Sequence, residues 1–310
     1  MGRRIVAAIG GNALGATLPE QRRAAEETAR VLAGLIQGGD QVVLVHGSGP
    51  QIGLISAAMT GLSRTDPDHP MAPLSVCTAM AQGYIGYDLQ NALGEELLRR
   101  GLHWRPVVTL LTQVEVDPAD PAFDHPDKPV GTFLTEAEAQ EMARRGNPVM
   151  EDAGRGWRRA VASPRPKRVV ELESIRTLLD HGTVVVAGGG GGIPVAAQGN
   201  ALKGVGAVVD KDFTAALLAR ELDAQVLLIL TGVAGVSVHY GKPNQRQLTH
   251  MTVPVAREYL ARGEFAAGSM GPKVAAGAEF AQSGPGRRCV ITDLSHAADA
   301  LRGQAGTTIG

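Results

Sequence analysis

The chain has 310 residues, of which 44% are hydrophobic and only 4% aromatic, so its core must consist mainly of Val, Leu, Ile and Ala. A core of this kind favours parallel strands that helices bury on both faces, in one large domain or in two halves that share a sheet. Lys and Arg number 30 against 31 Asp and Glu, and this near balance argues against a nucleic-acid or membrane surface.

The cysteines and the N-terminal segment indicate where the protein resides. Cys77 and Cys289 lie far apart and show neither metal-ligand spacing nor a disulfide framework, so we expect buried thiols in a reduced cytoplasm. Arg3 and Arg4 precede a short apolar run, but that run ends at Gly10, which is too early for a signal peptide. No stretch approaches the roughly 20 apolar residues of a membrane span.

Glycine repeatedly follows apolar runs, and each such run predicts a buried strand that ends in a tight loop. These runs lie in residues 5–15, 42–51, 184–194 and 227–236, and residues 289–292 predict a later strand. Helical segments alternate with them at residues 19–37, 74–100, 212–220 and 272–282. The alternation predicts right-handed βαβ crossovers and a mostly parallel sheet with helices on both faces. Ligands of such a sheet bind at the carboxyl ends of its strands.

Residues 113–167 interrupt this alternation. The segment carries many charges, little strand pattern and the prolines Pro118, Pro121, Pro126, Pro129, Pro148, Pro164 and Pro166. A structureless loop of this length is unusual in a compact domain. We therefore expect an excursion from the sheet edge that forms a small lid.

The glycine loops suit phosphate, because backbone N–H groups can approach an anion there and a following helix N-terminus adds its dipole. A plain tight turn is the alternative for any single loop. A dinucleotide fingerprint starting at Gly188 fails because Ile193 takes the place of the third glycine. A Walker phosphate loop near Lys242 fails because Val236 takes the first glycine position and Pro243 replaces Ser or Thr. The sequence therefore supports neither a classical dehydrogenase nor a Walker-type NTPase.

A set of segments in register along the whole chain carries a more specific signal. They are GGNALG (10–15), HGSGPQIG (46–53), AQGYIGYDLQNAL (81–93), DKPVG (127–131), EDAGRGWRR (151–159), AGGGGGIPV (187–195), VVDKDFTAALLA (208–219), YGKPNQ (240–245) and FAAGSMGPKV (265–274). In order and spacing, these segments resemble the carbamate kinases of the amino acid kinase family.

The resemblance implies an architecture and an activity. The fold would be a single domain over residues 1–310, an open three-layer α/β/α sandwich with a mostly parallel central sheet and a small protruding subdomain at about 113–167. Residues 1–200 would form the half that binds carbamate or carbamoyl phosphate, and residues 201–310 the half that binds ATP or ADP. The activity would be reversible phosphoryl transfer between ATP and carbamate, by a cytoplasmic homodimer that serves arginine breakdown.

Phosphoryl transfer between two anions needs positioning and positive charge over the moving group more than covalent help. The wider fold family usually has a lysine just before the first glycine pair, where this chain has Ala8 and Ile9. The resemblance implies that Lys211 replaces that lysine and that Lys211 and Lys273 neutralise the transferred phosphoryl group. Asp212 would then orient both lysines.

The local sequence supports two of the implied lysines. Lys211 stands between two aspartates at an expected strand end. Lys273 follows the glycines of GSMGP at a helix start, where the helix dipole disfavours a cation unless an anion is present. Lys128 depends on the resemblance alone, which implies that it reaches carbamoyl phosphate as the subdomain closes. A lone lysine, by contrast, is most often a solvated surface charge.

The first two glycine loops supply the candidates for holding phosphate oxygens, which are Gly10, Gly11, Asn12, Gly47, Ser48 and Gly49. Asn12 has the alternative role of a helix N-cap. His46 is expected to be structural, because carbamate is already a nucleophilic anion and needs no general base. Trp157, Arg158 and Arg159 either pack the excursion or contact substrate.

For the nucleotide, the resemblance implies a site formed by Gly189, Gly190, Asp210, Thr231, Tyr240, Met270 and Gly271. Mg²⁺ would accompany ATP or ADP and be held largely by phosphates and waters, with Asp210 as a helper and no dedicated protein site.

The chain departs from the family pattern at a few positions, and these leave two other functions open. Ser48 stands where HGNGPQ is usual, and Gly232 and Ala234 stand where TDVDGV or a similar sequence is common. One alternative is a related kinase with another small carboxylate or phosphate acceptor. The other is a nucleotide-binding regulator that has lost catalysis.

Overall fold

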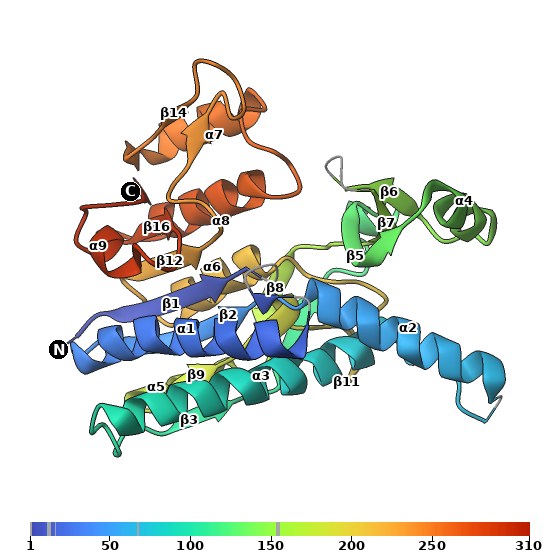
Figure 1. Cartoon of the computed structure of the whole chain (residues 1–310), viewed down its shortest axis with the longest axis horizontal. Helices are drawn as coiled ribbons and strands as arrows, with labels where there is room; N and C mark the ends of the chain where they lie inside the picture. The colour runs from blue at the N-terminus through green and yellow to red at the C-terminus, as the bar shows by residue number, and fades with distance from the viewer. Residues whose placement is uncertain (1, 11–13, 16, 67, 153–155) are drawn as a thin grey trace.

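An eight-stranded sheet forms the centre of the protein in a computed structural model, which describes residues 2–10, 14–15, 17–66, 68–152 and 156–310. Its strands lie in the order β15-β17-β16-β12-β1-β2-β9-β3 (Figure 1). In that order they span His250–Met251, Thr307–Ile309, Arg288–Thr292, Val226–Leu230, Arg4–Ile9, Gln41–His46, Val184–Val186 and Val107–Thr109. Every neighbouring pair is parallel except β16 with β17, so the prediction of a mostly parallel sheet is confirmed.

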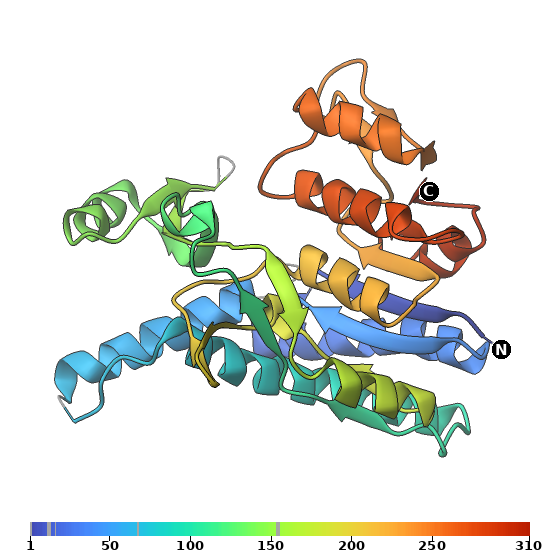
Figure 2. The ribbon, with the colours of Figure 1, turned by 180° about the vertical axis from the view of Figure 1, so that it is seen from behind.

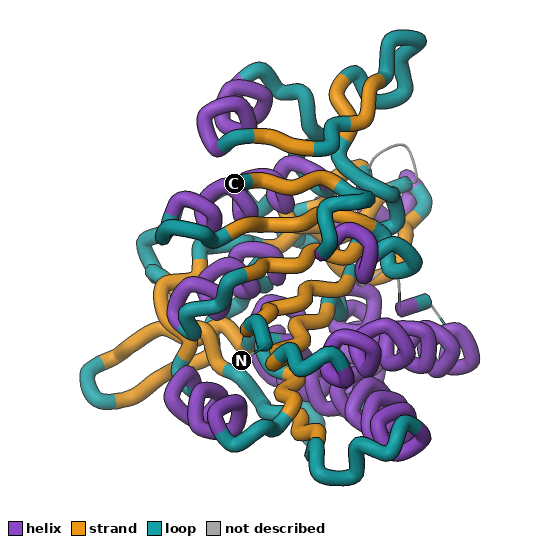
Figure 3. Tube along the Cα trace, turned by 90° about the vertical axis from the view of Figure 1, so that its left-hand side faces the viewer, coloured by secondary structure: helices purple, strands orange, loops and turns teal. Residues whose placement is uncertain are grey.

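Helices cover both faces of this sheet, as Figure 3 shows in purple around the orange strands. One layer consists of α1 (Leu18–Gln37), α3 (Leu74–Arg99) and α9 (Ala297–Leu301). The other consists of α5 (Leu172–Asp180), α6 (Lys211–Glu221), α7 (Val253–Ala261) and α8 (Met270–Gln282). Alternate residues of each central strand enter the two layers, as the strand period of two requires. The predicted three-layer α/β/α sandwich is therefore confirmed.

The four predicted helices correspond to α1, α3, α6 and α8, but a long helix was missed. Helix α2 spans Gly49–Thr65 and begins directly after the second glycine loop, where the sequence suggested only a tight turn. Its outer face is largely exposed, so it lacks the broad apolar stripe that marks a helix in a sequence. The expected strand end before Lys211 was also wrong, because Lys211 opens α6 and only an isolated bridge at Ala207 precedes it.

The excursion contains more strand structure than its sequence suggested. Residues 113–167 include four complete strands and part of a fifth, although the segment shows little strand pattern. A second sheet has the order β11-β10-β4-β8, with spans Ala201–Gly204, Ile193–Gln198, Gln113–Val116 and Pro166–Val169. A third has the order β5-β7-β6, with spans Lys128–Leu134, Trp157–Val161 and Val149–Glu151. The strands of these two sheets are short and rich in polar residues, which explains why the strand pattern in the sequence is weak.

The third sheet and α4 (Glu136–Arg144) form the protruding subdomain, which extends from the body beside α2 (Figures 1 and 2). Short elements complete the fold: the 3₁₀ turns Pro121–Phe123 and Gly189–Gly191 and the hairpin of β13 (Ser237–Val238) with β14 (Arg246–Gln247). Among the described residues, no helix has both the length and the apolarity that a membrane span requires.

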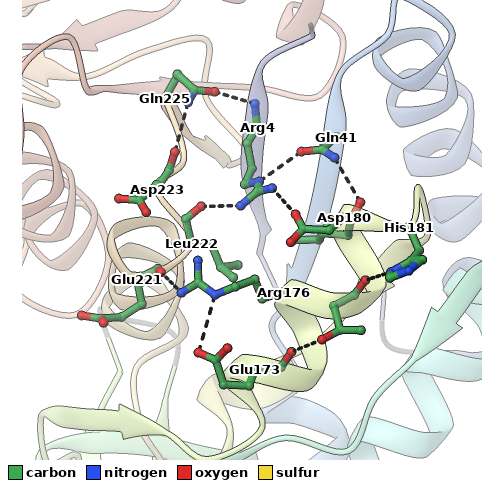
Figure 4. Close-up of polar contacts among 12 residues, drawn as sticks. Arg4, Gln41, Glu173, Arg176, Asp180, His181, Glu221, Leu222, Asp223 and Gln225 are labelled. Carbon is green, nitrogen blue, oxygen red and sulfur yellow. Dashed lines mark hydrogen bonds and ion pairs between the residues drawn. The ribbon is translucent and has the colours of Figure 1, made fainter.

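A single arginine joins the amino ends of the sheet (Figure 4). The Arg4 guanidinium donates to the Gln41 Oε1 at 3.1 Å, to the Leu222 carbonyl at 2.8 Å and to the Asp180 carboxylate at 2.7 Å. Gln41 is the first residue of β2, Asp180 is the last residue of α5 and Leu222 directly follows α6, so one side chain links β1 to these three elements. At this point the amino edge is held together by internal contacts.

The subdomain contacts the body where two glycines meet. A Cβ on Gly53 of α2 would lie 1.9 Å from the Gly131 Cα of β5, so only glycine permits this approach of two backbones. By contrast, a Cβ on Gly61, two turns further along α2, would meet nothing within 4 Å.

We predict opposite effects of alanine at these two glycines. Gly53→Ala should lower the free energy of unfolding by about 1–3 kcal/mol, because neither backbone can yield without separating α2 from β5. Gly61→Ala should raise it by roughly 0.5–1 kcal/mol, because alanine has the higher helix propensity and no clash. Urea unfolding of both variants measures the difference, and equal effects would contradict the close contact.

Candidate active site

The carboxyl ends of four adjacent strands surround a cavity of about 420 Å³. Gly10, Gly47 and Thr231 directly follow β1, β2 and β12, and Gly190 lies in the loop after β9. The predicted meeting of glycine loops at this edge is therefore confirmed. The lining residues are Gly10, Gly47, Ser48, Gly49, Pro50, Lys128, Pro129, Val130, Asp152, Arg158, Gly190, Val208, Val209, Asp210, Lys211, Asp212, Thr231, Gly232, Gly268, Ser269 and Lys273.

One carboxylate at the wall of this cavity holds two lysines. The Lys211 Nζ lies 2.7 Å from the Asp212 Oδ1, and the Lys273 Nζ lies 2.8 Å from the Asp212 Oδ2. The side chains are 11%, 13% and 3% exposed for Lys211, Lys273 and Asp212 respectively. Helix α6 supplies Lys211 and Asp212, and helix α8 supplies Lys273. The fold therefore brings two ammonium groups from distant segments of the chain to one carboxylate.

The charges of this triad depend on one another. Burial opposes ionisation of Asp212, but the two ammonium groups outweigh it and hold the pKa of the carboxyl below its usual range. Burial lowers the pKa of Lys211, with Lys273 acting in the same direction and Asp212 opposing them. We conclude that Asp212 is ionised and that its charge is what allows two cations to remain so close together.

A second ion pair connects the protruding subdomain to the same cavity. Lys128 of β5 contacts the Asp210 Oδ2 through its Nζ. Asp210 is the N-cap of α6, and its Oδ1 accepts from the Asp212 N–H at 2.9 Å. The N-cap therefore fixes the start of the helix that carries Lys211 and Asp212, while its other oxygen holds the subdomain.

Arg158 of β7 also lines the cavity, and the sequence had left its role open between packing and substrate contact. Its Nε donates to the Gly131 carbonyl at 2.9 Å, and its Nη1 lies 2.9 Å from the Asp152 Oδ2. The guanidinium stands 5.4 Å from the centre of the Phe133 ring, and the side chain is 11% exposed. The arginine is thus oriented by the subdomain and presents a fixed positive charge to the cavity.

Ser48 contributes a hydroxyl that has no hydrogen-bond partner in the described part of the chain. Its Oγ is buried and forms no hydrogen bond with any residue that the structure describes. Although Ser48 is the N-cap of α2, its side chain does not cap the helix. A buried hydroxyl in this state is costly unless a ligand or water satisfies it, and it lies at the helix end where an anion is favoured.

The other predicted site residues have different positions. Gly11 and Asn12 lie outside the described residues. Gly189 packs on His46, Met270 and Gly271 begin α8, and Tyr240 is 70% exposed, and none of these four lines the cavity. Their contact with nucleotide stays a prediction. The sequence missed Gly268 and Ser269, which precede α8 and line the cavity beside Lys273.

A dedicated metal centre is not evident from the side chains. Within the described part of the chain, no group of three or more His, Cys, Asp or Glu side chains could hold a metal ion. Asp210 lines the cavity and could hold Mg²⁺, since hard cations prefer oxygen ligands. Its Oδ2 faces Lys128, so a cation at this oxygen would take the place of that ammonium group.

His46 lies beneath the glycine loop that follows β9. A Cβ on Gly189 would lie 2.2 Å from the His46 Nε2, so the ring packs directly against this loop. Burial lowers the pKa of His46 from 6.5 to about 4, assisted by the charge of Lys211 and opposed by a backbone hydrogen bond at Gly47. The imidazole is therefore neutral at pH 7 and packs beneath the glycine loop.

We predict that His46 makes stability depend on pH. Because its folded pKa is depressed, the unfolded chain binds the proton more readily between about pH 6.5 and 4, so stability falls as pH falls through this window. The loss attributable to this buried ring is roughly 3 kcal/mol in total. Urea unfolding at several pH values should show a shallower decline for His46→Gln than for the native protein, and parallel curves would contradict the assignment.

Comparison with known proteins agrees with this geometry. The model of the amino acid kinase family matches residues 3–293. The chain is 50% identical to the carbamate kinase-like protein YqeA of Escherichia coli, across 100% of this chain and 99% of that protein. It is 46% identical to a carbamate kinase of Clostridium perfringens, across 99% of each.

Solved structures give the same result. Carbamate kinase from Giardia lamblia bound to citric acid superposes with a TM-score of 0.91 at 41% identity, covering 99% of this chain and 98% of that one. The same enzyme bound to AMP-PNP superposes with a TM-score of 0.88, with the same identity and coverage. The resemblance that the sequence motifs indicated is confirmed, and the chain belongs to the amino acid kinase family.

Proposed function

We propose that this protein is a carbamate kinase, which transfers a phosphoryl group between carbamoyl phosphate and ADP. The observation that carries the proposal is the triad of Lys211, Asp212 and Lys273 at the wall of a cavity floored by glycine backbone. Two fixed ammonium groups can neutralise the charge on a transferring phosphoryl group, which is the main demand of this chemistry. The carbamate kinases among its relatives support the same choice of substrate.

The reaction moves one bond between two oxygens. A terminal oxygen of the ADP β-phosphate attacks the phosphorus of carbamoyl phosphate, and the bond from phosphorus to the carbamate oxygen breaks. Carbamate leaves as an anion and ATP forms, so no proton has to move in this step. Lys211 and Lys273 would contact the oxygens of the transferring group, and Asp212 would keep both ammonium groups in place.

Carbamoyl phosphate fits the side of the cavity formed by the first two glycine loops and the protruding subdomain. Gly10 and Gly47 offer backbone at the ends of β1 and β2, and the unpaired Ser48 hydroxyl can donate to a substrate oxygen. Lys128 and Arg158 add positive charge from the subdomain. These groups match the anionic phosphate and the neutral, polar carbamoyl group of a small acyl phosphate.

The nucleotide would enter from the side of Thr231 and Gly232, where Gly268 and Ser269 also line the cavity. This chain has Gly232 where the family often has a carboxylate. A Cβ on Gly232 would meet nothing within 4 Å, so the space beside this residue is open. ADP phosphates would therefore be held by the lysines and the backbone, with Mg²⁺ neutralising them. Asp210 would turn from Lys128 to this cation, which leaves Lys128 free for carbamoyl phosphate.

The proposal includes a reduced, cytoplasmic setting. Cys77 and Cys289 are both buried and unpaired. Burial raises the pKa of each thiol, with the charge of Asp212 adding to the effect at Cys289. Cysteines that remain free thiols are typical of a reducing compartment, where disulfides are rare.

We predict that the triad lysines are required for turnover. Lys211→Ala and Lys273→Ala should each lower kcat by about 10²–10³ in an assay that couples ATP formation from ADP and carbamoyl phosphate, because each removes a charge on the transferring group. Lys203→Ala, which changes an exposed lysine of β11, is the matched control and should retain full activity.

Other results would contradict the mechanism or support one of the two alternative functions. Full turnover by both triad variants would contradict the mechanism. If the native protein binds ADP by calorimetry but does not turn over, the regulator is supported. If it phosphorylates another small carboxylate from ATP but not carbamate, the related kinase is supported.

A homodimer is the assembly that we propose, with α3 at its interface. Four large apolar side chains share one face of this helix and are 46–66% exposed, namely Val76, Met80, Tyr87 and Leu98. Gly83 and Gly94 lie on the same face, and a Cβ at either would meet nothing within 4 Å. An exposed apolar stripe with glycine in its centre suits close packing of α3 against α3 of a second copy about a twofold axis.

We predict that charge on this stripe separates the copies. The double variant Met80→Glu with Tyr87→Glu should sediment as a monomer, because four carboxylates would face one another across a twofold interface. Leu54→Glu on α2 is the control, since Leu54 is 55% exposed and lies off this face. A double variant that keeps the native sedimentation coefficient would exclude α3 as the interface.

A further inference from the structure

The turn at residues 188–192, here called the glycine turn, forms part of the cavity floor through Gly190. Gly188, Gly190, Gly191 and Gly192 all have positive φ, between 62° and 91°. A chain of glycines has many conformations in this region, so the turn needs contacts from outside to keep one shape. Its shape matters because a Cβ on Gly190 would lie only 2.5 Å from the unpaired Ser48 Oγ.

Gln82 of α3, which does not line the cavity, supplies such a contact. Its side chain is 1% exposed, and its Nε2 donates to the Gly189 carbonyl at 2.9 Å and to the Thr112 carbonyl at 3.1 Å. Its Oε1 accepts from the Thr112 N–H at 2.9 Å. Both donor hydrogens and the acceptor of the amide are therefore used within the protein.

The same side chain also acts on the turn through Thr112. The Thr112 Oγ1 accepts from the Gly188 N–H at 2.9 Å and donates to the Leu110 carbonyl at 2.7 Å. Gln82 thus fixes Thr112 by two hydrogen bonds, and Thr112 fixes the first residue of the glycine turn. One buried amide thus holds the turn directly at Gly189 and, through Thr112, at Gly188.

We propose that Gln82 is a positioning residue for the acceptor site: its side-chain amide holds the glycine turn so that Gly190 and the Ser48 hydroxyl face carbamoyl phosphate in the binding geometry. The inference rests on the proposed function for the identity of the ligand. Gln82 does not line the cavity, so it acts only through the turn. The nucleotide side at Thr231 and Gly232 follows a different strand, and Gln82 has no hydrogen bond to it.

The same helix offers a matched control. Gln90 lies further along α3, and its Oε1 accepts from the Thr109 N–H at 2.6 Å. It therefore joins α3 to the backbone of the same region of chain, as Gln82 does, but it does not reach the glycine turn. A merely structural role would make the two glutamines equivalent in their effect on substrate.

The test compares Gln82→Met with Gln90→Met in the native full-length protein. Gln82→Met should raise KM for carbamoyl phosphate by about tenfold, while kcat changes by less than about threefold and the Kd for ADP by less than about twofold. Gln90→Met should leave all three within about twofold, whatever its effect on the melting temperature. Equal rises in KM for both variants, or a rise in the Kd for ADP as large as that in KM, would overturn the proposal.

Gln82→Glu gives a second reading if the methionine variant does not fold. It keeps the shape and the Oε1 acceptor but loses both donor hydrogens when ionised, so it should raise KM at least as far. Hydrogen exchange at residues 187–193 separates this proposal from the assigned function. Faster exchange there in a Gln82 variant, but not in Gln90→Met, supports positioning of the turn even if the native protein fails to use carbamoyl phosphate, and unchanged exchange overturns it.

Discussion

Asp212 occupies the position on which the rest of the site depends, since a single buried carboxylate separates two ammonium groups that would otherwise repel. The N-terminus of α6 supports this charge, because Asp210 caps the helix and accepts from the Asp212 N–H. Burial of all three side chains excludes the water that would weaken their interaction. The sheet then has a simple task, which is to bring the starts of α6 and α8 to the edge where the glycine loops end.

The protruding subdomain reaches the same edge by two unlike contacts. At Gly53 and Gly131 the backbones touch, which fixes where the subdomain stands. At Lys128 and Asp210 an ion pair spans the cavity, and such a pair can exchange partners when ligands bring their own charges. The position of the subdomain is thus set by its packing against α2. The charge of Lys128 does not set that position and remains available to substrate.

Much of the fold could be predicted because the central strands are mostly apolar and lead into glycine-rich loops. The same regularity located the cavity, since parallel strands place their carboxyl ends together. Helix α2 was missed because its exposed length has no apolar stripe, and the strands of the subdomain were missed because they are short and polar. Lys211 and Lys273 could be named from the family motifs, and so could Asp212 as the carboxylate that orients both. The geometry of these contacts depends on packing between α6 and α8, which no local pattern encodes.

Other site residues could not be predicted from the sequence, for a physical reason. Arg158 could not be assigned because its orientation follows from hydrogen bonds to Gly131 and Asp152 in a sheet that had not been recognised. Gln82 gave no signal, because a buried glutamine on a helix resembles any polar surface residue until its partners are known. The glycines of residues 188–192 could be recognised in the sequence, but the residues that hold them in place lie on distant segments of the chain.

The triad also constrains how this protein can change over generations. Loss of Lys211 or Lys273 alone leaves the buried Asp212 carboxylate with one ammonium partner instead of two. Loss of Asp212 alone leaves two buried cations facing each other. Every single-residue path away from the present arrangement therefore passes through an unbalanced buried charge. The three positions behave as one inherited unit, and any descendant with a different charge arrangement must have reached it through concerted replacement or through an intermediate that tolerates instability.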